Sequence, residues 1–372
     1  MINLLRLNLG LLLAFLPYHT AVVAATPKAW AYIAWWLPDG WRSAPLSAID
    51  RLFFFELKVN SNGEIAERNG WPEKWVDLRL AVRQKNTPLD LTLTLFDPAT
   101  FNSLFTSTEA THRLLEEAVS LAHQDGVAGL QLDFEIYTAI APDTITSYRS
   151  FVRELSNRLR RQSPSRNLSI FFPIGGESSL YDAATLRLVN QVVLQGYDAH
   201  WKGSKTAGPL SPLNGNEVAT WKKAVAQGVS LGVPKTRMLL SFPLYGYEWE
   251  VKGQIPRSET IGNGITTSFA LLPDSLLPDI QFNVLDRVKK YGATHDPVSG
   301  SSYYQFKRKN GEFVEGWFED VRALKRKTDY LEEEKLGGLA FFPLGYDGGQ
   351  LVDSFLRRRD LNNRQDSLNR SR

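Results

Sequence analysis

Eight short apolar segments recur along the chain between residues 31 and 343, and helical patterns separate them. We expect strands at 31–36, 51–57, 89–96, 129–135, 168–174, 191–197, 238–245 and 338–343, with helices at 111–124, 147–161, 183–190, 217–226 and 319–334. Strands that alternate with helices indicate βα units and a parallel sheet, and eight such units close a barrel. An open doubly wound sheet would alternate too, but no glycine-rich phosphate loop opens the first helix. The predicted fold is therefore α/β, a (β/α)₈ TIM barrel.

The segment between the seventh and eighth predicted strands is too long for one connecting helix. Its central part, about 252–314, contains alternating apolar and polar residues, for example Ser302-Tyr303-Tyr304-Gln305-Phe306. We expect a small α+β insertion here, on the face where the barrel strands end, so that it walls a cleft. The barrel with its insertion is expected to span 26–360, and the polar, Arg-rich residues 361–372 to form a frayed tail.

The first 25 residues have the layout of a secretory signal peptide. A short basic start that includes Arg6 precedes the apolar run 7–16, and small residues collect at 21–25, so cleavage is expected after Ala24 or Ala25. The apolar run is too short for a stable membrane span. We therefore expect an exported protein, periplasmic or secreted. The chain has no cysteine, so neither a lipid anchor nor a disulfide is expected.

The fourth predicted strand carries two acids on one face. Side chains alternate along a strand, and the even-numbered residues from Leu130 to Ile136 are apolar while the odd-numbered ones are Gln131, Asp133 and Glu135. One interpretation is an amphipathic edge strand whose polar face lies in water. The other is a barrel strand whose outer face packs on helices and whose inner acids meet a ligand at the strand's carboxyl end. The strand alone leaves both open.

Polar and aromatic residues at other predicted strand ends favour the second interpretation. Tyr197 and Asp198 end the sixth strand, Tyr245 and Tyr247 lie at the seventh, and Phe342 lies near the end of the eighth. Each has a structural alternative, such as helix capping by Asp198 or rim packing by the tyrosines. Acids beside aromatic rings, without a nucleophilic Ser or Cys motif, together indicate glycoside chemistry.

Other ligand classes have little support in the sequence. The chain has five His, and none lies in a cluster with the spacing of metal ligands. A zinc hydrolase is therefore not expected, and we predict no metal-binding residues. The formal charge of +3 and the absence of a basic stripe with interleaved aromatics exclude nucleic acid as an expected partner. No cofactor is expected, and we expect a monomer.

Four segments, in order, resemble glycoside hydrolase family 18, most closely its bacterial branch of spore-cortex-lytic N-acetylglucosaminidases and cell-wall hydrolases. Residues 128–135 (Ala-Gly-Leu-Gln-Leu-Asp-Phe-Glu) resemble the family's Asp-Gly-x-Asp-x-Asp-x-Glu signature. Residues 195–201 (Gln-Gly-Tyr-Asp-Ala-His-Trp) are similar to its Met-x-Tyr-Asp segment, and 241–249 to its Pro-Leu-Tyr-Gly-Tyr segment. Residues 316–320 and 337–339 are similar to the closing helix and strand.

The resemblance implies a retaining, substrate-assisted reaction in which the sugar's own 2-acetamido oxygen is the nucleophile. Glu135 would be the general acid and then the base, and Asp133 would orient the acetamido N–H. Tyr197 would donate a hydrogen bond to the acetamido carbonyl. No metal or cofactor is implied. The implied substrate-binding residues are Trp36, Gln131, Asp198, Trp201, Tyr245, Tyr247 and Phe342.

The chain departs from the family pattern at several positions. The first signature acid is Ala128 and the middle one is Gln131, which we expect to hydrogen-bond Asp133. Phe342 stands where many members have Trp, and Thr94-Leu95-Phe96-Asp97 occupies the region of the Ser-x-Gly-Gly segment of chitinases.

The leading hypothesis is an exported hydrolase of β-1,4 linkages in N-acetylglucosamine-containing glycans: peptidoglycan, chitin-type oligomers or an N-acetylated exopolysaccharide. The alternatives are a non-catalytic, carbohydrate-binding relative and a structural envelope protein.

Overall fold

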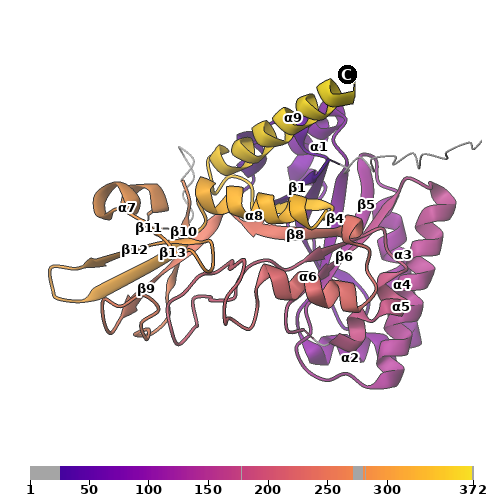
Figure 1. Ribbon diagram of the computed structural model, residues 1–372. Coiled ribbons are helices and arrows are strands. Elements are labelled where there is room, and N and C mark those ends of the chain that lie inside the picture. Colours follow the sequence, from indigo (N-terminus) through magenta and orange to yellow (C-terminus); the bar gives the residue numbers. More distant parts are fainter. Residues whose placement is uncertain (1–25, 177, 271–279, 281, 371–372) are drawn as a thin grey trace, which may run out of the picture.

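The computed structural model describes residues 26–176, 178–270, 280 and 282–370, so the predicted signal peptide, 1–25, lies outside the described residues. Eight parallel strands form a closed barrel at the centre of the molecule (Figure 1). They are β1 (Lys28–Ala34), β2 (Arg51–Val59), β4 (Leu89–Leu95), β5 (Val127–Phe134), β6 (Asn167–Phe172), β7 (Gln191–Leu194), β8 (Met238–Pro243) and β14 (Gly338–Phe342). Because β1 pairs with both β14 and β2, the sheet has no free barrel edge, and the predicted TIM barrel is confirmed.

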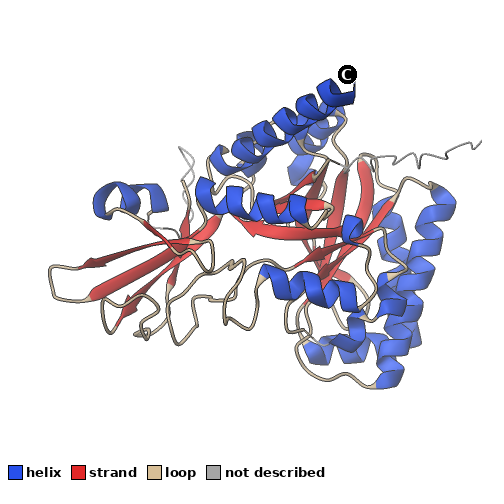
Figure 2. Ribbon diagram, in the orientation of Figure 1, coloured by secondary structure: helices blue, strands red, loops and turns tan. Residues whose placement is uncertain are grey.

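Helices cover the outside of the barrel (Figure 2). They are α1 (Val76–Lys85), α2 (Pro98–Thr106), α3 (Thr108–Ala122), α4 (Pro142–Gln162), α5 (Ala183–Leu186), α6 (Trp221–Ser230), α8 (Val321–Glu333) and α9 (Gln350–Arg370). Local chemistry sets several starts: Ser107, Thr220 and Asp320 each accept a backbone N–H bond as N-cap of α3, α6 and α8. Short 3₁₀ turns are η1 (Gly40–Ser43), η2 (Leu46–Ala48), η3 (Glu73–Trp75), η4 (Ser178–Tyr181) and η5 (Lys235–Arg237).

Strand β5 lies between β4 and β6, so the edge-strand interpretation of this segment is wrong. Its outer face packs on helices, and the Phe134 ring lies 6.4 Å from Phe101 of α2 and 6.1 Å from Tyr148 of α4 between centroids. The barrel interior is filled by a separate apolar cluster: Trp30, Tyr32, Phe53, Phe171, Val193, Leu239 and Ala340. Residues of β5 that point inward therefore enter a packed barrel, not solvent.

A second, antiparallel sheet projects from one side of the barrel (Figure 1). It consists of β9 (Tyr245–Val251), β10 (Ile265–Ser268), β11 (Thr294–His295), β12 (Ser302–Lys307) and β13 (Phe313–Phe318), in the order β10-β9-β13-β12-β11, with helix α7 (Val284–Tyr291) beside β12. The sheet begins before the expected 252 and ends after 314. The predicted strand 238–245 is in fact two, because the chain leaves β8 after Pro243 and Tyr245 pairs with Ser268 of β10. Strand β3 (Ile65–Glu67) is a short antiparallel addition to β2.

The C-terminal residues differ from the expected frayed tail. Residues 361–370 continue helix α9, and near the start of the described chain the Thr26 hydroxyl lies 2.6 Å from Asn363 Oδ1. No helix among the described residues is both long enough and apolar enough to cross a membrane.

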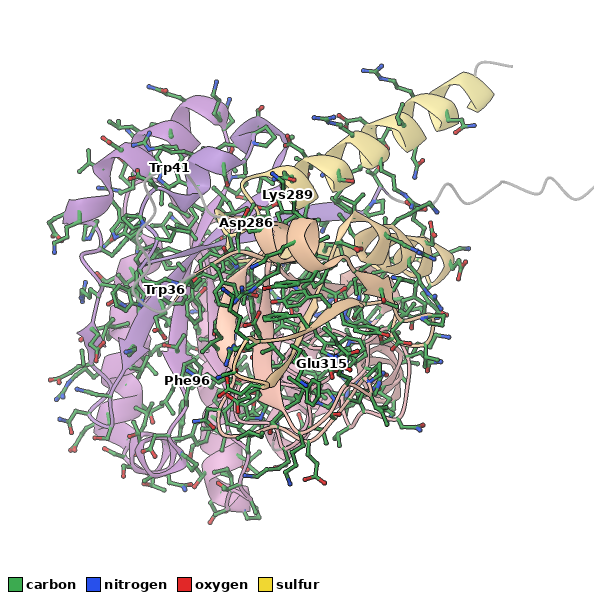
Figure 3. The ribbon with its side chains drawn as sticks, turned by 90° about the vertical axis from the view of Figure 1, so that its left-hand side faces the viewer. Trp36, Trp41, Phe96, Asp286, Lys289 and Glu315 are labelled. Carbon is green, nitrogen blue, oxygen red and sulfur yellow. The ribbon has the colours of Figure 1, made fainter. Side chains whose placement is uncertain are left out.

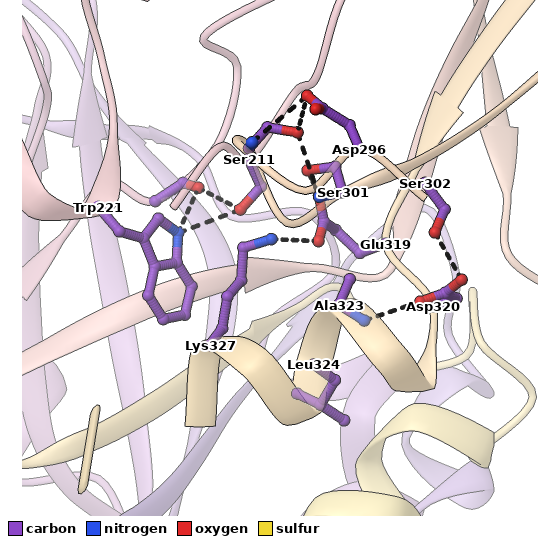
Figure 4. Close-up of polar contacts among 12 residues, drawn as sticks. Ser211, Trp221, Asp296, Ser301, Ser302, Glu319, Asp320, Ala323, Leu324 and Lys327 are labelled. Atoms are coloured by element: carbon purple, nitrogen blue, oxygen red, sulfur yellow. Dashed lines mark hydrogen bonds and ion pairs between the residues drawn. The ribbon is translucent and has the colours of Figure 1, made fainter. Parts of the chain in front are cut away.

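A fully buried ion pair joins α8 to the region between the barrel and the second sheet (Figure 4). Lys327 of α8 donates to Glu319, and neither side chain is exposed. The Ser301 hydroxyl also donates to Glu319, at 2.6 Å, and Ser302 donates to Asp320 at 2.7 Å. The Lys327 ammonium lies 5.8 Å from the ring centroid of Trp221 in α6. Charge pairing thus fixes the segment that returns from the second sheet to the barrel.

Candidate active site

The two acids of β5 lie at the carboxyl end of the strand. Asp133 pairs in register with Thr94 of β4 and is 3% exposed. Its Oδ1 is buried and has no hydrogen-bond partner among the described residues. Burial raises the pKa of Asp133 well above its usual value, and the charges of Glu135 and Glu56 act in the same direction. Ionisation of Asp133 is therefore unfavourable without a ligand group that donates to it.

Glu135 follows the last residue of β5 and is half-buried. Burial raises the pKa of Glu135 to about 7, the charge of Asp198 adds to the rise, and a hydrogen bond from Tyr137 opposes it. The Tyr137 hydroxyl donates to Glu135 Oε2 at 2.6 Å. A carboxyl group with a pKa near neutrality can both donate and accept a proton under ordinary conditions, as a general acid and base must.

Asp198 binds two tyrosines from the second sheet. Its Oδ1 accepts hydrogen bonds from the hydroxyls of Tyr245, at 2.8 Å, and Tyr247, at 3.0 Å. Burial raises the pKa of Asp198 to about 6, and the two hydrogen bonds oppose this rise. Asp198 lies in the loop after β7 and has a positive φ of 64°, a conformation that Asp tolerates better than most residues. The loop after β7 and strand β9 thus form one wall of the site.

Aromatic rings form the floor of the site. The rings of Tyr197 and Phe342 stack with centroids 5.8 Å apart and an interplanar angle of 24°. Phe55 meets Phe342 edge-on at 5.3 Å, and Trp36 meets Phe55 edge-on at 5.8 Å. The Trp36 Nε1 donates to the Tyr346 hydroxyl at 3.0 Å. Tyr197 also lines the cleft described next.

These groups open into one cleft of about 670 Å³. It is lined by Trp36, Phe55, Phe96, Asp133, Glu135, Tyr137, Ile174, Gln195, Tyr197, Asp198, Trp201, Lys202, Ala219, Tyr245, Tyr247 and Phe342. Trp201 is 52% exposed and Phe96 is 46% exposed, so both can offer a ring face to a ligand. Figure 3, drawn from the side of the second sheet, shows Trp36 and Phe96 on the barrel and Glu315 on β13. The cleft brings together every predicted site residue except Gln131.

Gln131 lies deeper in the barrel than expected and does not line the cleft. Its side chain is fully buried, accepts a hydrogen bond from Thr92 at 3.4 Å and donates one to Ser169 at 3.3 Å. No bond joins it to Asp133 in the described chain, contrary to the expectation from the sequence. Successive inward positions of a strand are two residues, about 7 Å, apart, which places Gln131 a full layer below Asp133.

The sequence analysis did not predict several residues in and around the cleft, among them one buried acid, one tyrosine and one lysine. Glu56 is a buried acid in the second half of β2, Tyr137 binds Glu135, and Lys202 brings a cation to the cleft. An acid within the otherwise apolar run 52–57 was a visible signal for Glu56. Lys202 had no comparable signal. In the part of the chain that the structure describes, no group of three or more His, Asp or Glu could hold a metal ion.

Sequence comparisons match the chain to one family over most of its length. The sequence model described as Glycosyl hydrolases family 18 matches residues 29–347. The glycosylase YdhD of Bacillus subtilis is 26% identical over 317 residues, which cover 81% of this chain and 66% of that protein. The cortical fragment-lytic enzyme of Bacillus anthracis is 23% identical over 325 residues, which cover 82% of this chain and 67% of that protein. The chain spans about two thirds of the length of these relatives.

Solved structures give the same fold. The structure described as a glycoside hydrolase family 18 N-acetylglucosaminidase from Paenibacillus barengoltzii has a TM-score of 0.71 and 17% sequence identity. The match covers 89% of this chain and 99% of that one.

Proposed function

The chain belongs to family 18 of the glycosyl hydrolases and is a glycosidase, and from this premise we propose that it cleaves β-1,4 linkages in N-acetylglucosamine-containing glycans. Peptidoglycan, chitin-type oligomers and N-acetylated exopolysaccharides share the 2-acetamido group that the proposed reaction needs. The name of the Bacillus anthracis relative describes lytic action on cortical fragments, and this action is one candidate for this chain.

In the first step, protonated Glu135 gives its proton to the glycosidic oxygen as the bond to the anomeric carbon breaks. The substrate's acetamido oxygen attacks that carbon and forms an oxazolinium ion, so configuration is retained after two displacements. Asp133 accepts a hydrogen bond from the acetamido N–H and its charge balances the cation. This role suits its unpartnered Oδ1, which lacks a donor in the described chain.

In the second step, Glu135 acts as a carboxylate and takes a proton from water. The resulting hydroxide-like oxygen attacks the anomeric carbon and reopens the oxazolinium ring. The Tyr197 hydroxyl donates to the acetamido carbonyl oxygen and holds it near the reacting carbon. Asp198 does not react, and its two tyrosine bonds keep the wall of the sugar site in place.

One observation carries the proposal. Glu135 is half-buried, its pKa is raised to about 7, and it lies next to buried Asp133 in a cleft lined by aromatic rings. A non-catalytic, carbohydrate-binding protein would need the rings and the shape of this cleft but not a proton donor poised near neutrality. If the protein only bound carbohydrate, or were a structural protein of the envelope, Glu135 would therefore have no role.

The test is product analysis by mass spectrometry after incubation with purified peptidoglycan and with chitin oligomers. Wild type should release shortened N-acetylated products, while Glu135→Gln should lose about 10²–10⁴-fold in rate and still bind the oligomers. Glu109→Gln, an exposed acid on α3, is the matched control and should keep full activity. Equal products from wild type and Glu135→Gln on every glycan would exclude the enzymatic role of Glu135.

A second experiment addresses substrate assistance. Fully deacetylated oligomers should not be cleaved, because an amine cannot provide the acetamido oxygen that attacks the anomeric carbon. Cleavage of these oligomers at the rate of the acetylated ones would contradict the proposed mechanism. It would still show that the protein is a glycosidase.

The proposal includes export, on the sequence pattern of residues 1–25. The chain with these residues should be recovered outside the cytoplasm with its new N-terminus near residue 25 or 26, and a chain that begins at residue 26 should stay inside. Retention of the full chain with Met1 intact would contradict export.

A further inference from the structure

A third carboxyl group lies behind the acid pair of the cleft. Glu56, in the second half of β2, is 6% exposed, and its Oε2 accepts a hydrogen bond from Thr94 at 2.7 Å. Thr94 is the residue of β4 that pairs in register with Asp133 of β5. One threonine thus stands between the two acids on neighbouring inward positions of the barrel.

This arrangement gives Asp133 acids on two sides. Glu135 follows it on its own chain, and Glu56 approaches from β2 across β4. Both charges contribute to the raised pKa of Asp133, after burial itself. Carboxylates that share a buried site cannot all be ionised at low cost, so at least one proton stays in the group.

Few opposite charges offset this row of acids. Lys58, two residues after Glu56, brings its Nζ to 4.0 Å from Glu56 Oε1, but it also binds Glu67 of β3 at 2.9 Å, and its side chain is 41% exposed. Lys202 is a second cation and lines the same cleft. The other titratable groups of the described chain that interact with Asp133 or Glu135 are an acid and tyrosines: Tyr32 of β1, Tyr137 after β5, Tyr181 of η4, and Tyr197 and Asp198 after β7.

We infer that Glu56 is a positioning residue of the active site: held by Thr94 beside Asp133, its carboxylate keeps a proton on the Asp133–Glu135 pair. The inference rests on the proposed glycosidase reaction, since Glu135 must enter the first step protonated. Gln131, in the middle of the strand, supplies no charge to this pair and binds Thr92 and Ser169 instead. Glu56 supplies that negative charge from a different strand.

The test is the dependence of kcat/KM on pH with a soluble chitin oligomer. Glu56→Gln keeps a hydrogen-bond acceptor for Thr94 but removes the charge. The alkaline limb of the profile, where kcat/KM falls with rising pH, should therefore shift to a pH about one unit lower. Lys58→Met removes the nearby cation and should move the limb up by a smaller amount, because Lys58 is partly in solvent. Glu64→Gln, an exposed acid in the turn before β3, is the control and should match wild type.

A readout that needs no turnover separates this inference from the proposed function. Infrared spectra recorded against pH detect protonated carboxyl groups, and Glu56→Gln should lose one at a lower pH than wild type does. Coincident profiles and spectra for Glu56→Gln and wild type, or an equal shift in Glu64→Gln, would overturn the inference. If wild type cleaves no glycan, the proposed function fails and the spectra still decide the role of Glu56. If Glu56→Gln does not fold, an unshifted Lys58→Met overturns the inference.

Discussion

The buried pair Lys327–Glu319 gives a sharp prediction about stability. Lys327→Met removes the cation and leaves Glu319, which is fully buried, with the Ser301 hydroxyl as its remaining side-chain donor in the described chain. Breaking one partner of a buried ion pair costs about 3–5 kcal/mol, since the remaining charge has no counterion. Lys325→Met on the same helix is the matched control: Lys325 is 68% exposed in its pair with Asp329, and such surface pairs contribute about 0–1 kcal/mol.

The loss should depend on pH. Burial raises the pKa of Glu319 to about 7 even beside Lys327, and without the cation the pKa should rise further. A carboxyl group whose folded pKa lies above its unfolded value costs nothing at low pH, where it is neutral in both states. It costs stability as the pH rises, by about 1.4 kcal/mol per unit. Between about pH 5 and about pH 8, Lys327→Met should therefore lose about 4 kcal/mol of its own stability. Wild type, in which the pKa of Glu319 is about 7, stops losing stability near that pH, so the deficit of the variant relative to wild type should grow by about 1.4 kcal/mol per unit above about pH 7.

The assay is guanidinium unfolding at both pH values, followed by tryptophan fluorescence. The double variant Lys327→Met with Glu319→Gln should recover most of the loss and show no pH dependence, because the new amide is uncharged and can still accept a hydrogen bond from Ser301. A loss under about 1 kcal/mol at the higher pH, or an equal loss at both pH values, would refute the reasoning about an unpaired buried carboxyl.

Three further predictions concern the cleft. Initial rates on an N-acetylated oligomer should fall about tenfold per unit above about pH 7, because Glu135 then loses the proton that it must donate; a flat profile to pH 9 would contradict its role. Tyr247→Phe removes one bond to Asp198 and should lower kcat/KM about tenfold in steady-state assays, whereas an unchanged value would show that this bond is dispensable. Trp201→Ala should raise KM by about three- to tenfold at constant kcat, since the exposed ring binds substrate and its transition state alike; a fall in kcat alone would argue against stacking.

The barrel was predictable because its signal is periodic and repeated. Each strand is a short apolar run between helical patterns, and the outward residues of β5 pack as their alternation indicated. The end of the seventh strand was misplaced because 238–251 is nearly continuous in strand character, and only tertiary pairing separates β8 from β9 at Leu244.

The site was predictable to the extent that its residues lie at strand ends. Asp133 and Glu135 lie at the end of β5, Tyr197 and Asp198 follow β7, and the fold brings such ends together. Gln131 was misassigned because alternation gives the face of a residue but not its depth in the barrel. Depth depends on the register between neighbouring strands, in which Gln131 pairs with Thr92 and Ser169.

Because two tyrosines of the second sheet bind Asp198, this sheet cannot be exchanged independently of the barrel. Its first strand, β9, contributes Tyr245 and Tyr247 to a carboxylate that belongs to the loop after β7. A chimera that received another relative's sheet without a matching tyrosine pair would leave the half-buried Asp198 near Glu135 without its donors. Anyone who exchanges this sheet to change specificity must therefore transplant the β7 loop with it.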